Sequence, residues 1–193
     1  TVVAIKECPG FLVNRLLMPY LNEAARALLE TKLTSEAIDD EAKKFGWPMG
    51  PFMLLDMLGL DVASEAANVL YRGSGERAKP CPLLGKLVEL NRLGQKTGVG
   101  FYGGEETIVE IIEKNFPGAR QSEAEASTVF YDRMMKGLVD EAVLALEEGI
   151  ASAEDIETGC LYGIGFPMAH EGPLHWAQKK GWLKKPVFQT KDW

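Results

Sequence analysis

Two stretches of this sequence are similar to each other, and that similarity limits the fold more than any other feature. Residues 15–30 align with residues 133–148 without a gap, and with short insertions the match extends from 46–52 to 165–174. Shared core positions, caps and breakers in one order indicate two copies of one unit. The identical pairs in the gap-free part are Arg15/Arg133, Glu23/Glu141, Ala24/Ala142, Ala27/Ala145, Leu28/Leu146 and Glu30/Glu148.

The residue pattern predicts that each copy is helical. In residues 12–29 apolar side chains recur in pairs at a four-residue spacing, which places a broad apolar stripe along one helix, and Arg15 falls off that stripe. Pro19 interrupts the pattern, so we expect a kink there. Strand signals are nearly absent, and the predicted fold class is therefore all-α, with two tandem related helical units packed as a pseudo-two-fold pair. A linear solenoid is the less favoured alternative, because two repeats are few for one.

Capping residues predict where several helices begin. Thr34 and Ser152 are expected to cap the second helix of each copy. Asp61 is expected to cap a helix that runs to about Tyr71. Residues 122–125 have the pattern of a capping box, which predicts the start of the second long helix.

These patterns divide the chain into three predicted segments. A first repeat covers 1–104 and ends in a glycine-rich loop, a linker with a connecting helix covers 105–126, and a second, degenerate repeat covers 127–193. The second repeat lacks the glycine-rich loop and has Asp132 where the first has Asn14. We therefore expect it to act as a structural partner of the first.

Composition excludes several classes of function. Lys and Arg total 21 against 28 Asp and Glu, and the net charge of −7 argues against a nucleic-acid partner. No apolar run approaches the roughly 20 residues of a membrane span. Three scattered cysteines predict neither a disulfide framework nor a zinc site, and they favour a cytoplasmic location. The two histidines, His170 and His175, lie late in the chain, so a reaction that needs His elsewhere must obtain it from outside the chain.

Few residues indicate chemistry by themselves. Asn14 is expected to be partly buried near the start of a helix, where its amide bonds to the backbone or, less favoured by spacing alone, to a ligand carbonyl. Lys96, in the glycine-rich loop, either meets a phosphate or is solvated. Tyr162 either presents its hydroxyl to a ligand or packs. Cys160 has no neighbouring base, so a nucleophilic role is not expected.

Two further patterns are weak as site signals. Residues 98–103 satisfy G-x-G-x-x-G, but a dinucleotide fingerprint needs a strand before it and a helix start at its last glycine, so we interpret the segment as a glycine turn. His170 and His175 flank Gly172 and do not share a helix face, with Glu171 beside them. One loop histidine and one helix-surface histidine are therefore favoured over a metal or catalytic pair.

Three motifs occur together in residues 8–16, 48–61 and 95–102: Cys-Pro-Gly-Phe-Leu-Val-Asn-Arg-Leu, Pro-Met-Gly-Pro-Phe followed by Leu-Asp and Gly-Leu-Asp, and Gln-Lys-Thr-Gly-x-Gly-Phe-Tyr. This combination resembles the C-terminal domain of the L-3-hydroxyacyl-CoA dehydrogenases. The second copy, with Tyr-Gly-Ile-Gly-Phe-Pro at 162–167, resembles the duplicated domain of the multifunctional fatty-acid oxidation α subunit, which also carries an enoyl-CoA hydratase domain. The fold implied is that of the 6-phosphogluconate dehydrogenase C-terminal domain.

The resemblance implies roles for three residues. Asn14 matches the family's active-site Asn, which contacts the acyl-CoA substrate and supports a His that this chain lacks. Lys96 matches a Lys that reaches the bound cofactor, and Tyr162 matches a Tyr associated with substrate. Residues 167–172 depart from the aromatic and basic stretch typical of the second copy.

The activity implied is that of an NAD-dependent L-3-hydroxyacyl-CoA dehydrogenase of fatty-acid β-oxidation, with this chain as its substrate-binding and dimerisation-type half. In that family a preceding Rossmann domain supplies the NAD site and a His–Glu pair, and the His takes the proton from the 3-hydroxyl as hydride leaves C3. We therefore expect the chain to be inactive alone. Its implied partners are an acyl-CoA, the Rossmann domain and a thiolase subunit, without a metal. The alternatives are a non-catalytic helical interaction module and a free-standing acyl-CoA binder.

Overall fold

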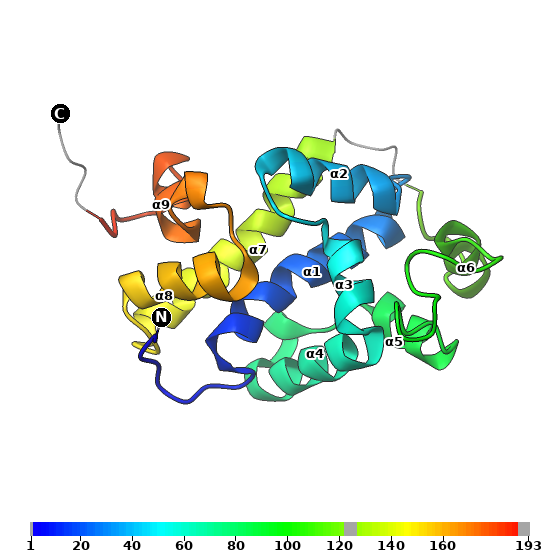
Figure 1. Cartoon of the computed structure of the whole chain (residues 1–193), viewed down its shortest axis with the longest axis horizontal. Coiled ribbons are helices and arrows are strands. Elements are labelled where there is room, and N and C mark those ends of the chain that lie inside the picture. The colour runs from blue at the N-terminus through cyan, green and yellow to red at the C-terminus, as the bar shows by residue number, and fades with distance from the viewer. Residues whose placement is uncertain (1, 122–126, 189–193) are drawn as a thin grey trace.

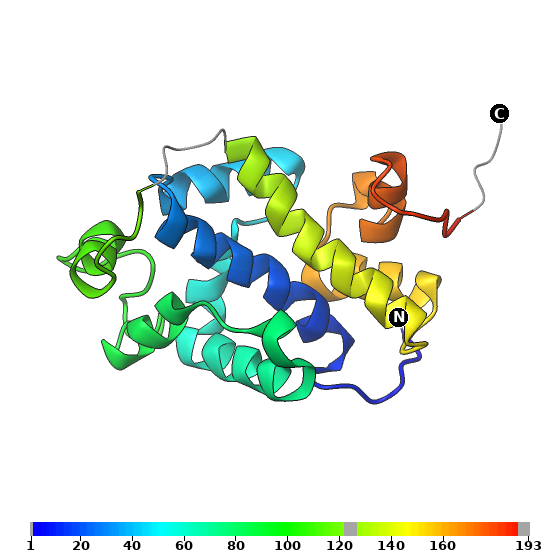
Figure 2. The ribbon, with the colours of Figure 1, turned by 180° about the vertical axis from the view of Figure 1, so that it is seen from behind.

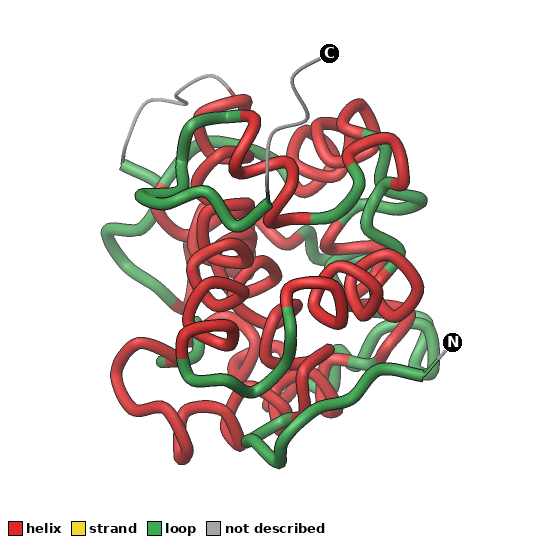
Figure 3. Tube along the Cα trace, turned by 90° about the vertical axis from the view of Figure 1, so that its left-hand side faces the viewer, coloured by secondary structure: helices red, strands yellow, loops and turns green. Residues whose placement is uncertain are grey.

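The computed structural model describes residues 2–121 and 127–188, and the all-α prediction is confirmed over these residues, which form helices and two isolated β-bridges but no strands (Figure 3). No helix among them is both long and apolar enough to span a bilayer. The capping box predicted at 122–125 lies outside the described residues. The elements are α1 (Phe11–Glu30), α2 (Ser35–Phe45), α3 (Pro51–Leu58), α4 (Leu60–Ser74), η1 (Gly75–Ala78), α5 (Pro82–Glu89), α6 (Ile108–Asn115), α7 (Ser127–Glu147), α8 (Ala153–Gly159), η2 (Cys160–Ile164), η3 (Met168–His170) and α9 (Pro173–Lys179).

The predicted caps are confirmed with one exception. The side chain of Thr34 accepts a hydrogen bond from the Ala37 amide at the start of α2, and Ser152 accepts one from the Asp155 amide at the start of α8. The prediction that Asp61 caps a helix is wrong. The helix α4 begins one residue earlier, after a glycine with a φ of 95°, and Asp61 lies within its first turn, so its carboxylate is available for another partner.

The long helices α1 and α7 pack side by side through the middle of the molecule (Figure 2). The first-repeat helices α2 to α5 surround one part of this pair, and α8 and α9 lie toward its other end (Figure 1). The helix α1 is continuous through Pro19, which faces Gly137 of α7, and a Cβ placed on that glycine would lie 3.5 Å from the Pro19 backbone. These two residues occupy aligned positions, so the helices meet at the midpoint of the repeat.

Arg15 is buried between the two long helices, which corrects the prediction that it lies off the apolar stripe. Its side chain is 4% exposed, and its Nε and Nη1 atoms lie 2.9 and 2.8 Å from carboxylate oxygens of Glu141 and Glu148 in the second repeat. Burial alone would lower the pKa of Arg15, but the two carboxylates outweigh it and the pKa is raised. The guanidinium therefore stays charged and links the N-terminal part of α1 to the end of α7.

The aligned residue Arg133 forms the reciprocal contact. Its Nε and Nη1 atoms lie 2.6 and 2.5 Å from Glu23 and Glu30 of the first repeat, although its side chain is 41% exposed. Each arginine thus binds the two glutamates that align with the other arginine's partners. A two-fold relation produces such reciprocity.

The loops after α2 and η2 show the same reciprocity. A Cβ on Gly46 would lie 3.2 Å from the ring of Pro167, and one on Gly165 would lie 3.4 Å from the ring of Pro48. The two glycines align with each other, as do the two prolines. These contacts agree with a pseudo-two-fold axis, and the relation between the complete units stays a prediction, as does the division of the chain at residues 104 and 126.

Arg15→Ala and Arg133→Ala should differ in their effect on stability. Removal of Arg15 empties a buried position and breaks its bonds to Glu141 and to the exposed Glu148, which we expect to cost about 2 kcal/mol of unfolding free energy. The exposed Arg133 pairs are worth about 1 kcal/mol at most. Urea unfolding of the two variants measures the difference. Equal losses would mean that burial of Arg15 does not strengthen its contacts.

Candidate functional site

Asn14 lies in the first turn of α1, and its side chain is exposed rather than partly buried as predicted. Among the residues that the structure describes, none forms a hydrogen bond with its amide. The N-cap of α1 is Gly10, with a φ of 74° and no side chain to accept from the first-turn amides. The Phe11 amide donates to the Cys8 carbonyl, but the described residues provide no side-chain cap, so the start of α1 presents a free carboxamide and backbone N–H groups without a side-chain partner.

Tyr162 lies on the π-helical turn η2, and its side chain is 64% exposed. This turn packs against the start of α1, because a Cβ on Gly163 would lie only 2.9 Å from a methyl group of Val13. Tyr162 and Asn14 are the chain neighbours of these two contacting residues. The fold thus brings the two segments that carry these predicted site residues against each other, although they are far apart in sequence. Helical π-turns are frequent at functional sites.

Lys96 lies elsewhere, on the loop that follows α5. Its ammonium group forms an ion pair with Asp61, and both side chains remain about two-fifths exposed. The hydrogen bond from Lys96 lowers the pKa of the Asp61 carboxyl. Lys96 is therefore held in place by the first turn of α4 while staying accessible to a ligand.

The helix α4 separates Lys96 from the pair formed by Asn14 and Tyr162. Lys96 contacts the N-terminal turn of α4, whereas Gly10, just before α1, packs against Leu70 near its other end. The part of α4 between Asp61 and Leu70 is roughly 15 Å long. Lys96 therefore lies apart from the other two predicted site residues.

The loop that carries Lys96 is fixed by a buried carboxylate that the sequence analysis missed. The two oxygens of Asp56 accept hydrogen bonds from the Phe101 and Tyr102 amides at 2.8 and 3.0 Å, and the Arg92 side chain donates to the Gly100 carbonyl. Burial raises the pKa of Asp56 although these amides favour its charged form. The G-x-G-x-x-G segment is thus a compact turn built around Asp56.

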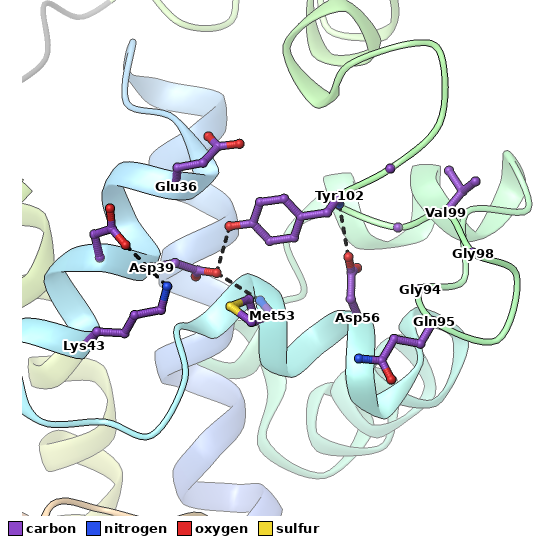
Figure 4. A pocket seen from close by; sticks show the side chains of 13 residues that line it. Glu36, Asp39, Lys43, Met53, Asp56, Gly94, Gln95, Gly98, Val99 and Tyr102 are labelled. Atoms are coloured by element: carbon purple, nitrogen blue, oxygen red, sulfur yellow. Dashed lines mark hydrogen bonds and ion pairs between the residues drawn. The ribbon is translucent and has the colours of Figure 1, made fainter.

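A second buried carboxylate, Asp39, ties the same loop to the start of α3. Its oxygens accept from the Phe52 and Met53 amides at 2.9 and 3.0 Å, and the Tyr102 hydroxyl donates to it at 2.8 Å (Figure 4). A pocket of about 680 Å³ lies between α2, α3 and the loop, and these carboxylates form part of its wall. Asn14, Lys96 and Tyr162 do not line this pocket, so we assign the carboxylates to holding the loop that carries Lys96.

Glu157 occupies the position aligned with Asp39 and caps α9 in the same way. Its carboxylate accepts from the His175 amide at 2.8 Å, and the same oxygen lies 3.0 Å from Nδ1 of the His175 ring. Burial raises the pKa of Glu157 to about 7 despite the bonds from the Leu174 and His175 amides. A Cβ on Gly172 would collide with this carboxylate, which explains the glycine before α9.

The remaining candidates do not form a reactive cluster. His170 stacks on Phe45 with ring centroids 4.1 Å apart, and His175 on α9 stacks on Phe188, so the two histidines have separate packing roles. Cys160 is buried, and burial raises the pKa of its thiol, which keeps it protonated. Within the described ranges no group of three His, Cys, Asp or Glu side chains is placed to hold a metal ion.

Gly100→Ala should disrupt the loop that carries Lys96, because the added methyl group overlaps the Asp56 carboxylate. We expect a loss of about 2 kcal/mol or more in unfolding free energy. The matched control is Gly85→Ala in α5, where no atom lies within 4 Å of the added Cβ and a gain of about 0.5–1 kcal/mol is expected. Urea unfolding of both variants tests this, and a harmless Gly100→Ala would contradict the described loop packing.

The buried Glu157 predicts a pH-dependent stability. Its pKa is higher in the folded than in the unfolded chain, so the folded state binds more protons, and stability is lost as the pH rises from about 4.5 to about 7. This loss should amount to about 2–3 kcal/mol and be absent in Glu157→Gln. Unfolding curves at pH 5 and pH 8, with Glu154→Gln on the exposed side of α8 as the control, measure it. An unchanged pH slope in Glu157→Gln would be the contrary result.

Comparison with known proteins identifies the relatives of this chain. The family model for the C-terminal domain of 3-hydroxyacyl-CoA dehydrogenase matches residues 10–104 and 130–181. The chain is 36% identical over 187 residues to the fatty acid oxidation complex subunit alpha of Shewanella putrefaciens, covering 94% of this chain and 26% of that protein. The subunit of the same name from Acinetobacter baumannii is 35% identical over 196 residues, with coverages of 94% and 27%. The chain thus spans about a quarter of the length of the curated relatives it matches.

Solved structures resemble the fold. A 3-hydroxybutyryl-CoA dehydrogenase from Escherichia coli K12 superposes with a TM-score of 0.77 over 93% of this chain and 55% of that chain, and at 23% identity this likeness shows the fold alone. The (S)-3-hydroxybutyryl-CoA dehydrogenase of Ralstonia eutropha is 38% identical, with a TM-score of 0.50, and covers 53% of this chain and 37% of that chain. The Ralstonia eutropha structure, which has the higher identity, therefore covers only about half of this chain, whereas the Escherichia coli structure extends over both repeats.

Proposed function

The chain belongs to the 3-hydroxyacyl-CoA dehydrogenase family, as its C-terminal domain, and on this basis we propose that it forms the substrate-side half of an NAD-dependent L-3-hydroxyacyl-CoA dehydrogenase of fatty acid oxidation. The observation that carries the proposal is the unpartnered carboxamide of Asn14 at the uncapped start of α1, beside the exposed Tyr162. The names of the relatives, subunits of fatty acid oxidation complexes, support the reaction class.

In this proposal Asn14 stabilises the substrate where its charge changes. Its amide N–H donates a hydrogen bond to the 3-oxygen of the acyl-CoA, which is a hydroxyl in one direction of the reaction and a carbonyl in the other. The uncapped N–H groups at the start of α1 add positive potential at the same place. Tyr162, on the adjoining π-turn, contacts the bound acyl-CoA.

NAD supplies the hydride acceptor when bound, and the residues of this chain fit only an edge of its site. Lys96, held by Asp61, offers an accessible cation to the cofactor, but the glycine turn that carries it is not preceded by a strand. A Rossmann domain outside this chain therefore binds most of the cofactor and supplies the general base.

In this proposal that domain docks on a face of exposed apolar side chains. Met53, Met57 and Leu58 on α3 and Val62 on α4 are 43–57% exposed, and they lie beside the loop that carries Lys96. An enoyl-CoA hydratase domain and a thiolase subunit complete the proposed assembly, in a cytoplasmic location without a metal.

The test uses a chimera in which this chain replaces the segment that it matches in the Shewanella putrefaciens subunit alpha. Reduction of acetoacetyl-CoA by NADH is measured. Asn14→Ala should lower kcat/KM by roughly 10²-fold, since loss of one active-site donor has that size of effect. The chain alone should show no turnover above background.

The controls separate a lost contact from a lost fold. Asp132→Ala, at the aligned position in the second repeat, should leave kcat/KM within about twofold, because among the described residues Asp132 pairs only with Lys180 on the surface. An Asn14→Ala effect below about threefold, with the chimera folded and active, would contradict the proposed role. Turnover by the chain alone would contradict the proposal that it holds half of the site.

A further inference from the structure

The start of α1 needs support from elsewhere in the fold. Its N-cap is a glycine in the left-handed region, Phe11 has a φ of 53°, and no side chain caps the first turn. Helices with uncapped ends fray, because the first backbone N–H groups lack partners. Asn14 lies in this turn, so the position of its amide depends on whatever fixes the turn.

The fixed point next to this turn is Arg15, the residue that follows Asn14. Its guanidinium is bound by Glu141 of α7 and by Glu148, just after α7, and Glu141 is in turn paired with Arg77. One nitrogen of Arg15, Nη2, is buried without a hydrogen-bond partner among the described residues. The bonds that Arg15 does form are directional, so they fix the position of this part of α1 against α7.

The second repeat provides a control for this arrangement within the same molecule. Arg133 binds Glu30 as Arg15 binds Glu148, and the two glutamates are similarly exposed, 46% and 44%. Arg133 itself is 41% exposed, and its neighbour is Asp132 rather than an asparagine. The same arginine–glutamate ion pair therefore occurs twice: Arg15–Glu148 lies next to Asn14 in the chain, and Arg133–Glu30 does not.

We propose that Arg15, held by Glu141 and Glu148, is a positioning residue for Asn14, so that the second repeat serves the reaction by fixing the start of α1. The glutamates act through the guanidinium and do not touch the substrate. This proposal rests on the proposed function, in which Asn14 contacts the substrate.

The experiment is a double-mutant cycle in the same chimera. Glu148→Gln removes one of the two carboxylate partners of Arg15 and should lower kcat/KM by roughly tenfold, because a small displacement of a site residue has that order of effect. The matched variant Glu30→Gln should change it by less than about twofold. In the Asn14→Ala background, Glu148→Gln should have no further effect, since the residue through which it acts is gone. The active fraction of each variant is determined by titration.

The outcomes separate this proposal from the one on which it rests. If Asn14→Ala has no effect, the proposed function fails. If Asn14→Ala has its effect but Glu148→Gln behaves like Glu30→Gln, or lowers kcat/KM by the same factor with and without Asn14, the proposed function stands and the positioning role of Arg15 is overturned.

Discussion

The contact between α1 and α7 is the interaction on which the rest of the structure depends. The two helices meet at Pro19 and Gly137, and the buried guanidinium of Arg15 joins the N-terminal part of α1 to the end of α7. Apolar packing favours the pair but is non-directional, whereas the bonds of Arg15 fix which part of α1 lies against which part of α7. The location of Asn14 follows from this register, since Asn14 is the neighbour of the buried arginine.

The two repeats share their framework and differ where a site is expected. In both, a carboxylate on the second helix accepts hydrogen bonds from the first amides of the third helix, through Asp39 in the first repeat and Glu157 in the second. The third partner of each carboxylate differs between the repeats. The hydroxyl of Tyr102, from the glycine-rich loop, donates to Asp39, whereas the ring of His175 lies beside Glu157. The first repeat therefore carries a loop with Lys96 that the second repeat lacks, on a framework that the two share.

The sequence predicts the helices well because caps and periodicity are local properties. Thr34 and Ser152 cap the helices that they were expected to cap, whereas Asp61 does not, because the N-cap of α4 is Gly59, two residues before Asp61. Burial of Arg15 was missed because periodicity reports polarity and cannot show that a charge meets its partners on another helix. The one available signal was that the arginine and both glutamates are repeated at the same spacing in the two copies. The spacing of residues along the sequence likewise cannot predict that the segments with Asn14 and Tyr162 lie against each other, because this contact arises only when the two repeats pack.

The central claim is that the start of α1, fixed by the second repeat, presents Asn14 to the reacting oxygen of an acyl-CoA. The most direct test is a crystal structure of the chimera with acetoacetyl-CoA bound, in which the distance from the Asn14 amide nitrogen to the 3-oxygen is measured. The account predicts a distance of about 3 Å, with the amide donating to that oxygen. An Asn14 side chain that points to solvent beyond hydrogen-bond range of a fully occupied substrate would contradict it.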